Sequence, residues 1–493
     1  MNERRKLATA AWTASVVYVA AISGGAAQSP ALQAPAVPPD GGGAFAAPTD
    51  QLSEAARAAI QAEIDRNVAE LRRAGRLAAP QALPASLWWP LRPSGLPDAG
   101  YSGISNFVDH NEAYPNQLLD YACGQRTYDQ AGGYNHAGTD IFSWPFAWLK
   151  MDNRQVEIVA PAPGTIVAKS DTNFDRSCTV NNNPWNAVYV QHADGSVGWY
   201  GHMKAGSLTS KSVGDTIATG EYLGTVGSSG SSTGPHVHFE LHDNLGALID
   251  PFEGACYTPP SGSWWQSQRP YRDSAVNAIT TGNAAPAFGS CPAPESPNAR
   301  WTFGPGATIY FTTYYRDQVA GQMTTYTIRR PDTSIYSTWM HMSPATYDAS
   351  YWYWYFTNLG PAGPTGTWSF EASYQGRLYT ATFTIGLTPF TDATLTAGVS
   401  PIRGVHVAEL RARIDVIRGR LGLAPYPWTD APVTPNTTVI RAVHMTELRA
   451  ALAEAYVRSG RAAPIYATPA PAPGVVVTAG AIVELRGAVA AIE

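Results

Sequence analysis

The run 234–241, Gly-Pro-His-Val-His-Phe-Glu-Leu, places two histidines, His236 and His238, two residues apart in a stretch typical of a β-strand. Side chains at positions i and i+2 of a strand leave the same face. Both imidazoles could therefore bind one metal ion, or one could bind the metal while the other transfers protons. A Gly/Ser-rich approach at 227–234 lets another group come close to the backbone. The sequence thus predicts a strand that lines an open cleft.

Further metal-binding side chains lie upstream of this strand. His136 and Asp140 offer an imidazole and a carboxylate at close spacing beside a glycine, and His202 follows an alternating run at 186–192. A catalytic zinc site typically has three protein ligands and leaves one position for water. His136, Asp140 and one histidine of the 236/238 pair would make such a set.

Taken in order, His-x-x-x-Asp, Tyr-x-His and Ser-Thr-Gly-Pro-His-x-His-Phe-Glu resemble the lysostaphin-type (LytM-type) zinc endopeptidases, which cut peptidoglycan cross-bridges. The resemblance covers roughly residues 120–260. It implies one zinc per chain held by His136, Asp140 and His238, with His202 and His236 as catalytic histidines. No motif position is substituted, so the zinc-free regulatory members of the family are a poor match. The implied fold is an open antiparallel β architecture whose groove holds the zinc.

The chemistry of amide hydrolysis agrees with these roles. Zinc lowers the pKa of a bound water to about 7 and so supplies a nucleophile at neutral pH. His236, on the same strand face as His238, is placed to accept a proton from that water as general base. His202 would stabilise the developing oxyanion or donate a proton to the leaving amine. The sequence does not show how these last two roles are divided between the two catalytic histidines, His202 and His236.

The ends and the composition indicate an exported protein. Residues 1–27 combine basic residues, an apolar stretch and small residues, which is the pattern of a signal peptide; an uncleaved anchor is the alternative. No second segment is long and apolar enough to span a bilayer. The net charge is −5 and there is no long basic run, so nothing indicates nucleic-acid binding. We expect a secreted, periplasmic or envelope-associated protein.

Four cysteines in an exported chain favour disulfides over free thiols. Three connectivities are possible, and we expect sequential pairing of Cys123 with Cys178 and of Cys256 with Cys291. No two cysteines have the spacing of a metal finger.

Residues 28–97 are interpreted as a Pro/Ala-rich linker followed by an amphipathic helix near 52–77, capped by Asp50 or Ser53. Ahead of the endopeptidase domain, expected at 98–260, this segment could be a propeptide that masks the zinc cleft. The alternative is a helix that only packs on the domain.

Residues 292–387 contain turn-separated strand runs and predict a β-sandwich of immunoglobulin-like type. The run 351–356, Tyr-Trp-Tyr-Trp-Tyr-Phe, is aromatic on both strand faces. One face can pack into the core; the other is either exposed for stacking or buried by a neighbouring domain.

Residues 391–493 repeat a pattern of the form Ile-Arg-x-Val-His-x-x-Glu-Leu-Arg, which predicts a small helical repeat module. His406 with Glu409, and His444 with Glu447, could chelate a metal from adjacent helical turns. Because Ala481 replaces the histidine in the third copy, helix packing or capping is the favoured interpretation.

The chain is therefore predicted to be a mainly β, exported zinc endopeptidase that hydrolyses peptide cross-links of bacterial peptidoglycan. Two alternatives stay open: a zinc endopeptidase acting on extracellular Gly-rich proteins, and a non-catalytic protein that binds the wall or regulates other enzymes.

Overall fold

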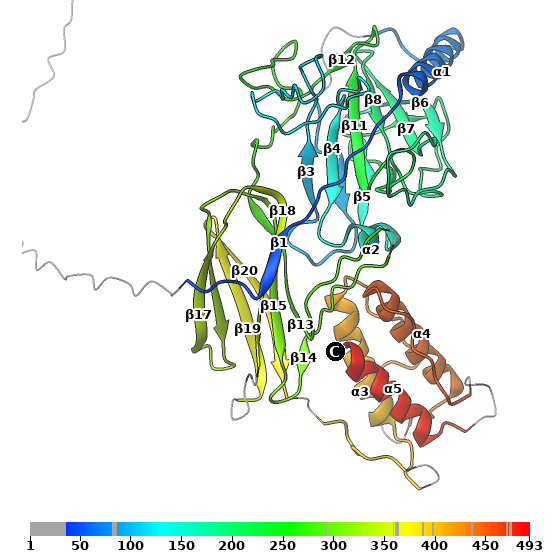
Figure 1. Cartoon of the computed structure of the whole chain (residues 1–493). Coiled ribbons are helices and arrows are strands. Elements are labelled where there is room, and N and C mark those ends of the chain that lie inside the picture. Colours follow the sequence, from blue (N-terminus) through cyan, green and yellow to red (C-terminus); the bar gives the residue numbers. More distant parts are fainter. Residues whose placement is uncertain are drawn as a thin grey trace, which may run out of the picture.

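The computed structural model describes residues 36–80, 86–291, 293–357, 359, 364–386, 389–396, 399–434, 437–469, 472 and 476–493. The predicted signal peptide, residues 1–27, lies outside the described residues. The described chain is mainly β, with open antiparallel sheets and three helices at its C-terminal end (Figure 1). Within those residues, no helix combines the length and apolarity needed to cross a membrane.

The first domain is built on a large antiparallel sheet. Its spatial order is β3 (Ser102–Asn106), β4 (Thr139–Ser143), β11 (His236–His242), β8 (Val197–Tyr200), β7 (Ala187–His192), β6 (Gly164–Ser170) and β9 (Thr216–Ile217), with β12 (Leu248–Ile249) paired to β11. A smaller sheet has the order β10 (Tyr222–Thr225), β5 (Val156–Val159) and β2 (Leu91–Pro93), and a short helix, α2 (Ala147–Asp152), follows β4.

The alternation of β11 explains how this sheet has one apolar and one polar face. Val237, Phe239 and Leu241 are buried in the main core of the domain. His236, His238 and Glu240 leave the opposite face, because successive side chains of a strand point to opposite sides. That polar face is also buried, so another part of the chain must cover it.

Part of the cover comes from α1 (Glu54–Arg73), which lies within the predicted helix at 52–77. Ser53 caps its N-terminus by accepting a hydrogen bond from the backbone N–H of Ala56, as one of the two predicted caps. Ile64, Val68 and Leu71 form the buried stripe of the helix and pack on β6, β7 and β8. The other predicted cap, Asp50, does not cap the helix and lies elsewhere, as described below.

The β-sandwich consists of two sheets. One contains β1 (Gly41–Ala44), β18 (Tyr347–Phe356), β15 (Ile309–Gln318) and β13 (Ala275–Gly282); the other contains β14 (Thr302–Phe303), β20 (Arg377–Ile385), β19 (Gly366–Tyr374), β16 (Met323–Arg329) and β17 (Ile335–Met342). Two of these strands, β1 and β13, come from outside the range 292–387 in which the sandwich was expected.

The aromatic run in β18 divides between the two faces of its strand. Trp352 and Trp354 are 6% and 2% exposed and belong to the core between the sheets. Tyr351 and Tyr353 point to the other face and are half-buried, while Tyr355 is 45% exposed. The tryptophans are therefore core residues, and any exposed aromatic surface is formed by the tyrosines.

The three C-terminal helices, α3 (Gly404–Arg420), α4 (Ala442–Arg458) and α5 (Ala479–Ile492), share one apolar core. His406 Nε2 lies 2.9 Å from an oxygen of Asp392, and His444 Nε2 lies 3.0 Å from one of Asp430. Each histidine also accepts the N–H of its N-cap residue through Nδ1. The repeated histidines thus cap helices, which is the interpretation that the sequence analysis favoured over metal binding.

The disulfides are Cys123–Cys256 and Cys178–Cys291, so the expected sequential pairing was wrong. The turn at Cys123 lies beside residues 254–257, where the N–H of Cys256 donates to the carbonyl of Tyr121 at 2.9 Å. Cys291 lies on a loop bridged between Ala287 and Ser296, which comes back against the first domain. Distance along the chain was a poor guide because sheet pairing brings remote loops together.

Residues 36–50, here called the strap, run from the sandwich to the first domain. In Figure 1 the blue chain leaves β1, crosses the strands of the large sheet and enters α1. Phe45 packs on Trp144 and Phe288, with ring centroids 4.6 and 5.1 Å away. The strap and α1 therefore cover the same polar face of the large sheet.

Candidate active site

Two neighbouring strands align the central side chains of the site. In the antiparallel pair of β4 and β11, Asp140 lies directly opposite His238, and Phe142 lies opposite His236. Cross-strand neighbours on one face are close enough for their side chains to touch. His136 precedes β4, and His202 follows β8 in a left-handed conformation with φ of 58° that turns it back over the sheet.

The predicted metal ligands converge on one point. His136 Nε2 lies 3.1 Å from an oxygen of Asp140 and 3.3 Å from Nδ1 of His238. Nδ1 of His238 is 2.9 Å from the other oxygen of Asp140. All three residues are fully buried. Two nitrogens and a carboxylate brought together in this way could bind a metal ion.

The outer nitrogens of the two histidines are held by acceptors, which fixes their tautomers. His136 Nδ1 donates to the carbonyl of Phe107 at 2.7 Å, and His238 Nε2 donates to Glu240 at 2.7 Å. The lone pairs of His136 Nε2 and His238 Nδ1 therefore face each other and Asp140. Orientation of metal-binding histidines by carbonyl and carboxylate groups is common at metal sites.

Glu240 is itself held by a buried ion pair from α1. Arg57 donates two hydrogen bonds, of 2.8 and 2.7 Å, to its two carboxylate oxygens. Burial alone would raise the pKa of Glu240, but Arg57 and the hydrogen bonds from His238 and His242 hold it well below its usual range. Glu240 is therefore a fixed anion behind His238.

Asp140 is also kept ionised. Burial opposes its charge, but the neighbouring imidazoles of His136 and His236 outweigh burial and lower the pKa of Asp140 well below its usual range. Asn106 adds a hydrogen bond of 3.0 Å to one of its oxygens. A carboxylate that stays ionised at neutral pH is available to a cation.

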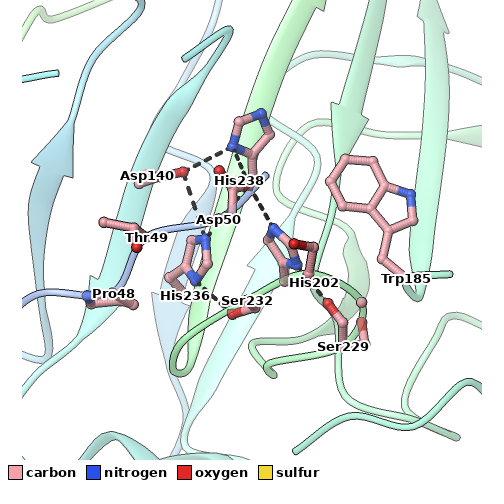
Figure 2. Close-up of polar contacts among 12 residues, drawn as sticks. Pro48, Thr49, Asp50, Asp140, Trp185, His202, Ser229, Ser232, His236 and His238 are labelled. Atoms are coloured by element: carbon pink, nitrogen blue, oxygen red, sulfur yellow. Dashed lines mark hydrogen bonds and ion pairs between the residues drawn. The ribbon is translucent and has the colours of Figure 1, made fainter. Parts of the chain in front are cut away.

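His236 and His202 lie beside this ligand set with one nitrogen each directed inward (Figure 2). Nδ1 of His236 donates to the carbonyl of Gly234 at 2.8 Å, so Nε2 carries the lone pair. Within the described part of the chain, this buried Nε2 has no hydrogen-bond partner. Nδ1 of His202 donates to the carbonyl of Ser229 at 2.6 Å, which leaves its Nε2 facing the site.

A residue that was not predicted, Asp50 of the strap, occupies the centre of the site (Figure 2). Its carboxylate is fully buried and lies 2.7 Å from His202 Nε2 and 2.9 Å from His238 Nδ1. Tyr128 contacts the same carboxylate through its hydroxyl, which also accepts the N–H of Asp50 at 2.9 Å. Asp50 thus adds a fourth possible ligand, a second carboxylate, to His136, Asp140 and His238.

Residues 135–251, which contain His136, Asp140, His238 and both inward-facing histidines, match Peptidase family M23. This part of the chain is an M23 metallopeptidase domain.

Two curated relatives of the M23 domain are named as endopeptidases, and one of them is named as a peptidoglycan enzyme. DD-carboxypeptidase/endopeptidase Mpg of Neisseria meningitidis is 42% identical over 74 residues, which is 15% of this chain and 16% of that protein. Peptidoglycan DD-endopeptidase ShyC of Vibrio cholerae is 31% identical over 89 residues, or 18% of this chain and 20% of that protein. The similarity thus spans less than a quarter of either relative.

Solved structures with local similarity include two peptidases. A mutant catalytic domain of the prophage-encoded M23 protein EnpA from Enterococcus faecalis is 26% identical, covering 29% of this chain and 95% of that one with a TM-score of 0.19. A zinc-containing peptidase from Vibrio cholerae is 18% identical, covering 30% and 36% of the two chains with a TM-score of 0.20.

The structure brings all five predicted site residues of the M23 domain together. It adds three that the sequence analysis missed: Asp50, Glu240 and Tyr128. Glu240 had a signal, because it lies two residues after His238 on the same strand face. Asp50 had none beyond being a candidate helix cap.

Proposed function

We propose that the chain is an exported zinc endopeptidase that hydrolyses peptide cross-links of bacterial peptidoglycan. The convergence of His136, Asp140 and His238 beside Nε2 of His236, which has no hydrogen bond, supports this proposal most directly. The name of one curated relative, peptidoglycan DD-endopeptidase ShyC, supports the substrate class.

The donor set fits zinc. Two imidazole nitrogens and one carboxylate oxygen, from His136, His238 and Asp140, are typical ligands of a catalytic zinc ion with an open position. Their outer contacts to Phe107 and Glu240 would keep both rings in place when the metal binds. When bound, zinc would acidify a water molecule and polarise the carbonyl of the scissile peptide bond.

The two remaining histidines would move protons. With its proton fixed on Nδ1 by Gly234, His236 presents a basic Nε2 and would act as general base toward the attacking water. His202, whose Nδ1 proton is held by Ser229, would use Nε2 to stabilise the oxyanion or to protonate the leaving amine. Both nitrogens are buried, which shields these proton transfers from bulk water.

The strap would keep this site latent. Asp50 contacts the inner nitrogens of His202 and His238, where a substrate carbonyl and its attacking water need space. Thr49 extends the block, since its carbonyl accepts the N–H of Thr233 at 3.0 Å and its own N–H donates to Thr233 Oγ1 at 2.8 Å. Activity would therefore require displacement or removal of the strap.

A second candidate function is hydrolysis of extracellular Gly-rich proteins. One observation favours it: the strap presents three consecutive glycines, Gly41–Gly43, in an extended strand just before it enters the site. A segment that blocks a protease in extended form can resemble its substrate. The sandwich, which we assign to the immunoglobulin-like type, and the helical module would then position the enzyme on its substrate.

Replacement of individual site residues tests the proposed function. His136→Ala, Asp140→Ala and His238→Ala should each lose bound zinc, because each removes one of three ligands. His202→Ala and His236→Ala should keep about one zinc per chain and lose about 100-fold or more in turnover. Zinc content and digestion of purified peptidoglycan, beside a soluble Gly-rich protein, are the measurements.

The outcomes separate the candidates. A full complement of zinc in any of the first three variants would remove that residue from the ligand set. Stoichiometric zinc without hydrolysis of either substrate by strap-free protein would favour the non-catalytic alternative.

A further inference from the structure

The β18 strand of the sandwich is an edge strand that the strap covers. Among the described strands, β18 pairs with β15 on one side and with β1 on the other (Figure 1). The register places Gly41 opposite Tyr353, Gly42 opposite Trp352 and Ala44 opposite Ser350. If the strap leaves, the backbone groups of β18 on this side lose their partners.

The β18 edge accepts glycine where other residues would clash. A Cβ atom on Gly42 would lie 2.2 Å from the carbonyl oxygen of Tyr351, and Gly42 has φ of 126°, which L side chains rarely adopt. A Cβ on Gly41 would lie 2.2 Å from the hydroxyl of Tyr353. The first contact is with backbone and cannot relax by side-chain rotation. The backbone contact therefore requires glycine at position 42, whereas a side chain at position 41 would require the Tyr353 side chain to move.

Specific contacts hold the segment on both sides of the glycines. The N–H of Asp40 donates to the carbonyl of Tyr353 at 2.9 Å, and its carboxylate accepts the N–H of Tyr355 at 2.8 Å. After the glycines, the N–H of Phe45 donates to the carbonyl of Ala349 at 2.9 Å. The ring of Phe45 then packs on Trp144 of the first domain. The strap is thus held by polar contacts at Asp40, by close packing of Gly41 and Gly42 against β18, and by ring contacts at Phe45.

We propose that the β18 edge is a binding site for an extended, diglycine-containing segment of a protein substrate, and that strap residues 40–45 occupy this site in the latent chain. The proposal rests on the second candidate function, hydrolysis of Gly-rich proteins, and on the strap being displaced in the active enzyme. Addition of a strand to a sheet edge gives affinity through main-chain hydrogen bonds, and the requirement for glycine at position 42 gives selectivity.

The position of the edge connects binding to cleavage. Between Ala44 and Asp50 the strap can span at most about 20 Å, because an extended residue covers no more than about 3.6 Å. A polypeptide bound along β18 in the direction of the strap would therefore enter the catalytic site a few residues later. Binding at the edge would raise the local concentration of susceptible bonds.

β18 has ten residues and is rich in aromatic side chains. If its edge were left unpaired, it would promote aggregation. Unpaired edges promote association between chains, and natural proteins usually cover or interrupt them. The glycine strand provides such a cover before activation, and a glycine-rich substrate segment would replace it afterwards.

A peptide-binding experiment on the full chain tests the proposal. Gly42→Val should release β1 from β18, whereas the matched change Ala44→Val, at an exposed position suited to a strand, should leave β1 in place. Both chains also carry His236→Ala to suppress cleavage. The probe is a fluorescent peptide of residues 37–46, and its binding is followed by anisotropy.

We expect the Gly42→Val chain to bind the peptide at least tenfold more tightly than the Ala44→Val chain. The same peptide with Gly42→Ala should bind at least tenfold more weakly. Equal binding of the two peptides, or equal binding by the two chains, would overturn the proposal. If Gly42→Val fails to fold by circular dichroism, the Gly42→Ala chain is used with the same criteria.

Competition against the fluorescent peptide shows which kind of molecule binds the β18 edge in the active enzyme. A soluble polypeptide of repeated Asp-Gly-Gly-Gly-Ala-Phe units should displace the probe, and purified sacculi should not. Displacement by sacculi alone would overturn the assignment to a protein segment. Because binding is measured without turnover, failure of this proposal is distinguishable from absence of hydrolysis, which bears on the proposed function.

Discussion

Replacing Asp50 should activate the unprocessed chain. The carboxylate of Asp50 is buried against His202, His238 and Tyr128, with distances of 2.7 Å to His202 and 2.9 Å to His238. A hydrogen bond to a charged group typically contributes about 1.5–3 kcal/mol. Tyr128 donates one such bond to the carboxylate, so Asp50→Ala would weaken closure of the strap by at least about 1.5 kcal/mol. Since about 1.4 kcal/mol corresponds to a factor of ten, the open fraction should rise at least about tenfold.

Hydrolysis of peptidoglycan by the full chain is the assay for this prediction. We expect Asp50→Ala to be at least tenfold more active than the unsubstituted chain, with equal zinc content. Asp65→Ala is the control, because Asp65 lies on the exposed side of α1 and bonds only to Gln61 among its described hydrogen bonds. Unchanged or lower activity of the zinc-loaded Asp50→Ala chain would refute the blocking role.

Three further predictions concern buried groups outside the reacting centre. Glu240→Gln should weaken zinc binding about 10–100-fold in a chelator competition, because a neutral amide replaces the anion that orients His238. Trp354→Ala should lower the free energy of unfolding by about 3–5 kcal/mol in a denaturant titration, because the side chain is in the sandwich core. Burial raises the pKa of Glu295 to about 7 from an ordinary 4.5, so its ionisation in the folded chain is unfavourable. Glu295→Gln should therefore change stability little at pH 4.5 and increase it by up to about 3 kcal/mol above pH 7, as thermal unfolding at the two pH values would show.

The geometry of the candidate metal site was largely accessible from the sequence because it follows from strand periodicity. His236 and His238 share a face for the same reason that Val237 and Phe239 share the core. The order of the motifs then predicted His136, Asp140 and His202 as site residues, and the structure places them around one point. Glu240 follows from the same periodicity and could have been predicted.

The features that were missed all depend on contacts between remote segments. Asp50 reaches the site only because the strap crosses the sheet, and nothing near Asp50 in the sequence indicates this path. The disulfides follow loop positions set by strand order rather than by sequence distance. The edge of β18 is covered by Gly41–Ala44, which lie about 300 residues earlier in the sequence.

The two ends of the strap should reinforce each other, because both bind as parts of one segment. While β1 is paired with β18, Asp50 is held near the site at a high effective concentration, and release of β1 lowers that concentration. Gly42→Val alone should therefore increase activity of the full chain only modestly, since Asp50 and Thr49 keep their own contacts.

The combination of Gly42→Val with Asp50→Ala tests this coupling. For two independent clamps, the factors measured for the single variants would multiply in the double variant. For one cooperative strap, Asp50→Ala already removes most of the closure. The activity of the double variant should then rise by less than the product of the two factors measured for the single variants. Initial rates of peptidoglycan hydrolysis for the four chains decide between the two cases, and a strictly multiplicative result would show that β1 and Asp50 are held independently.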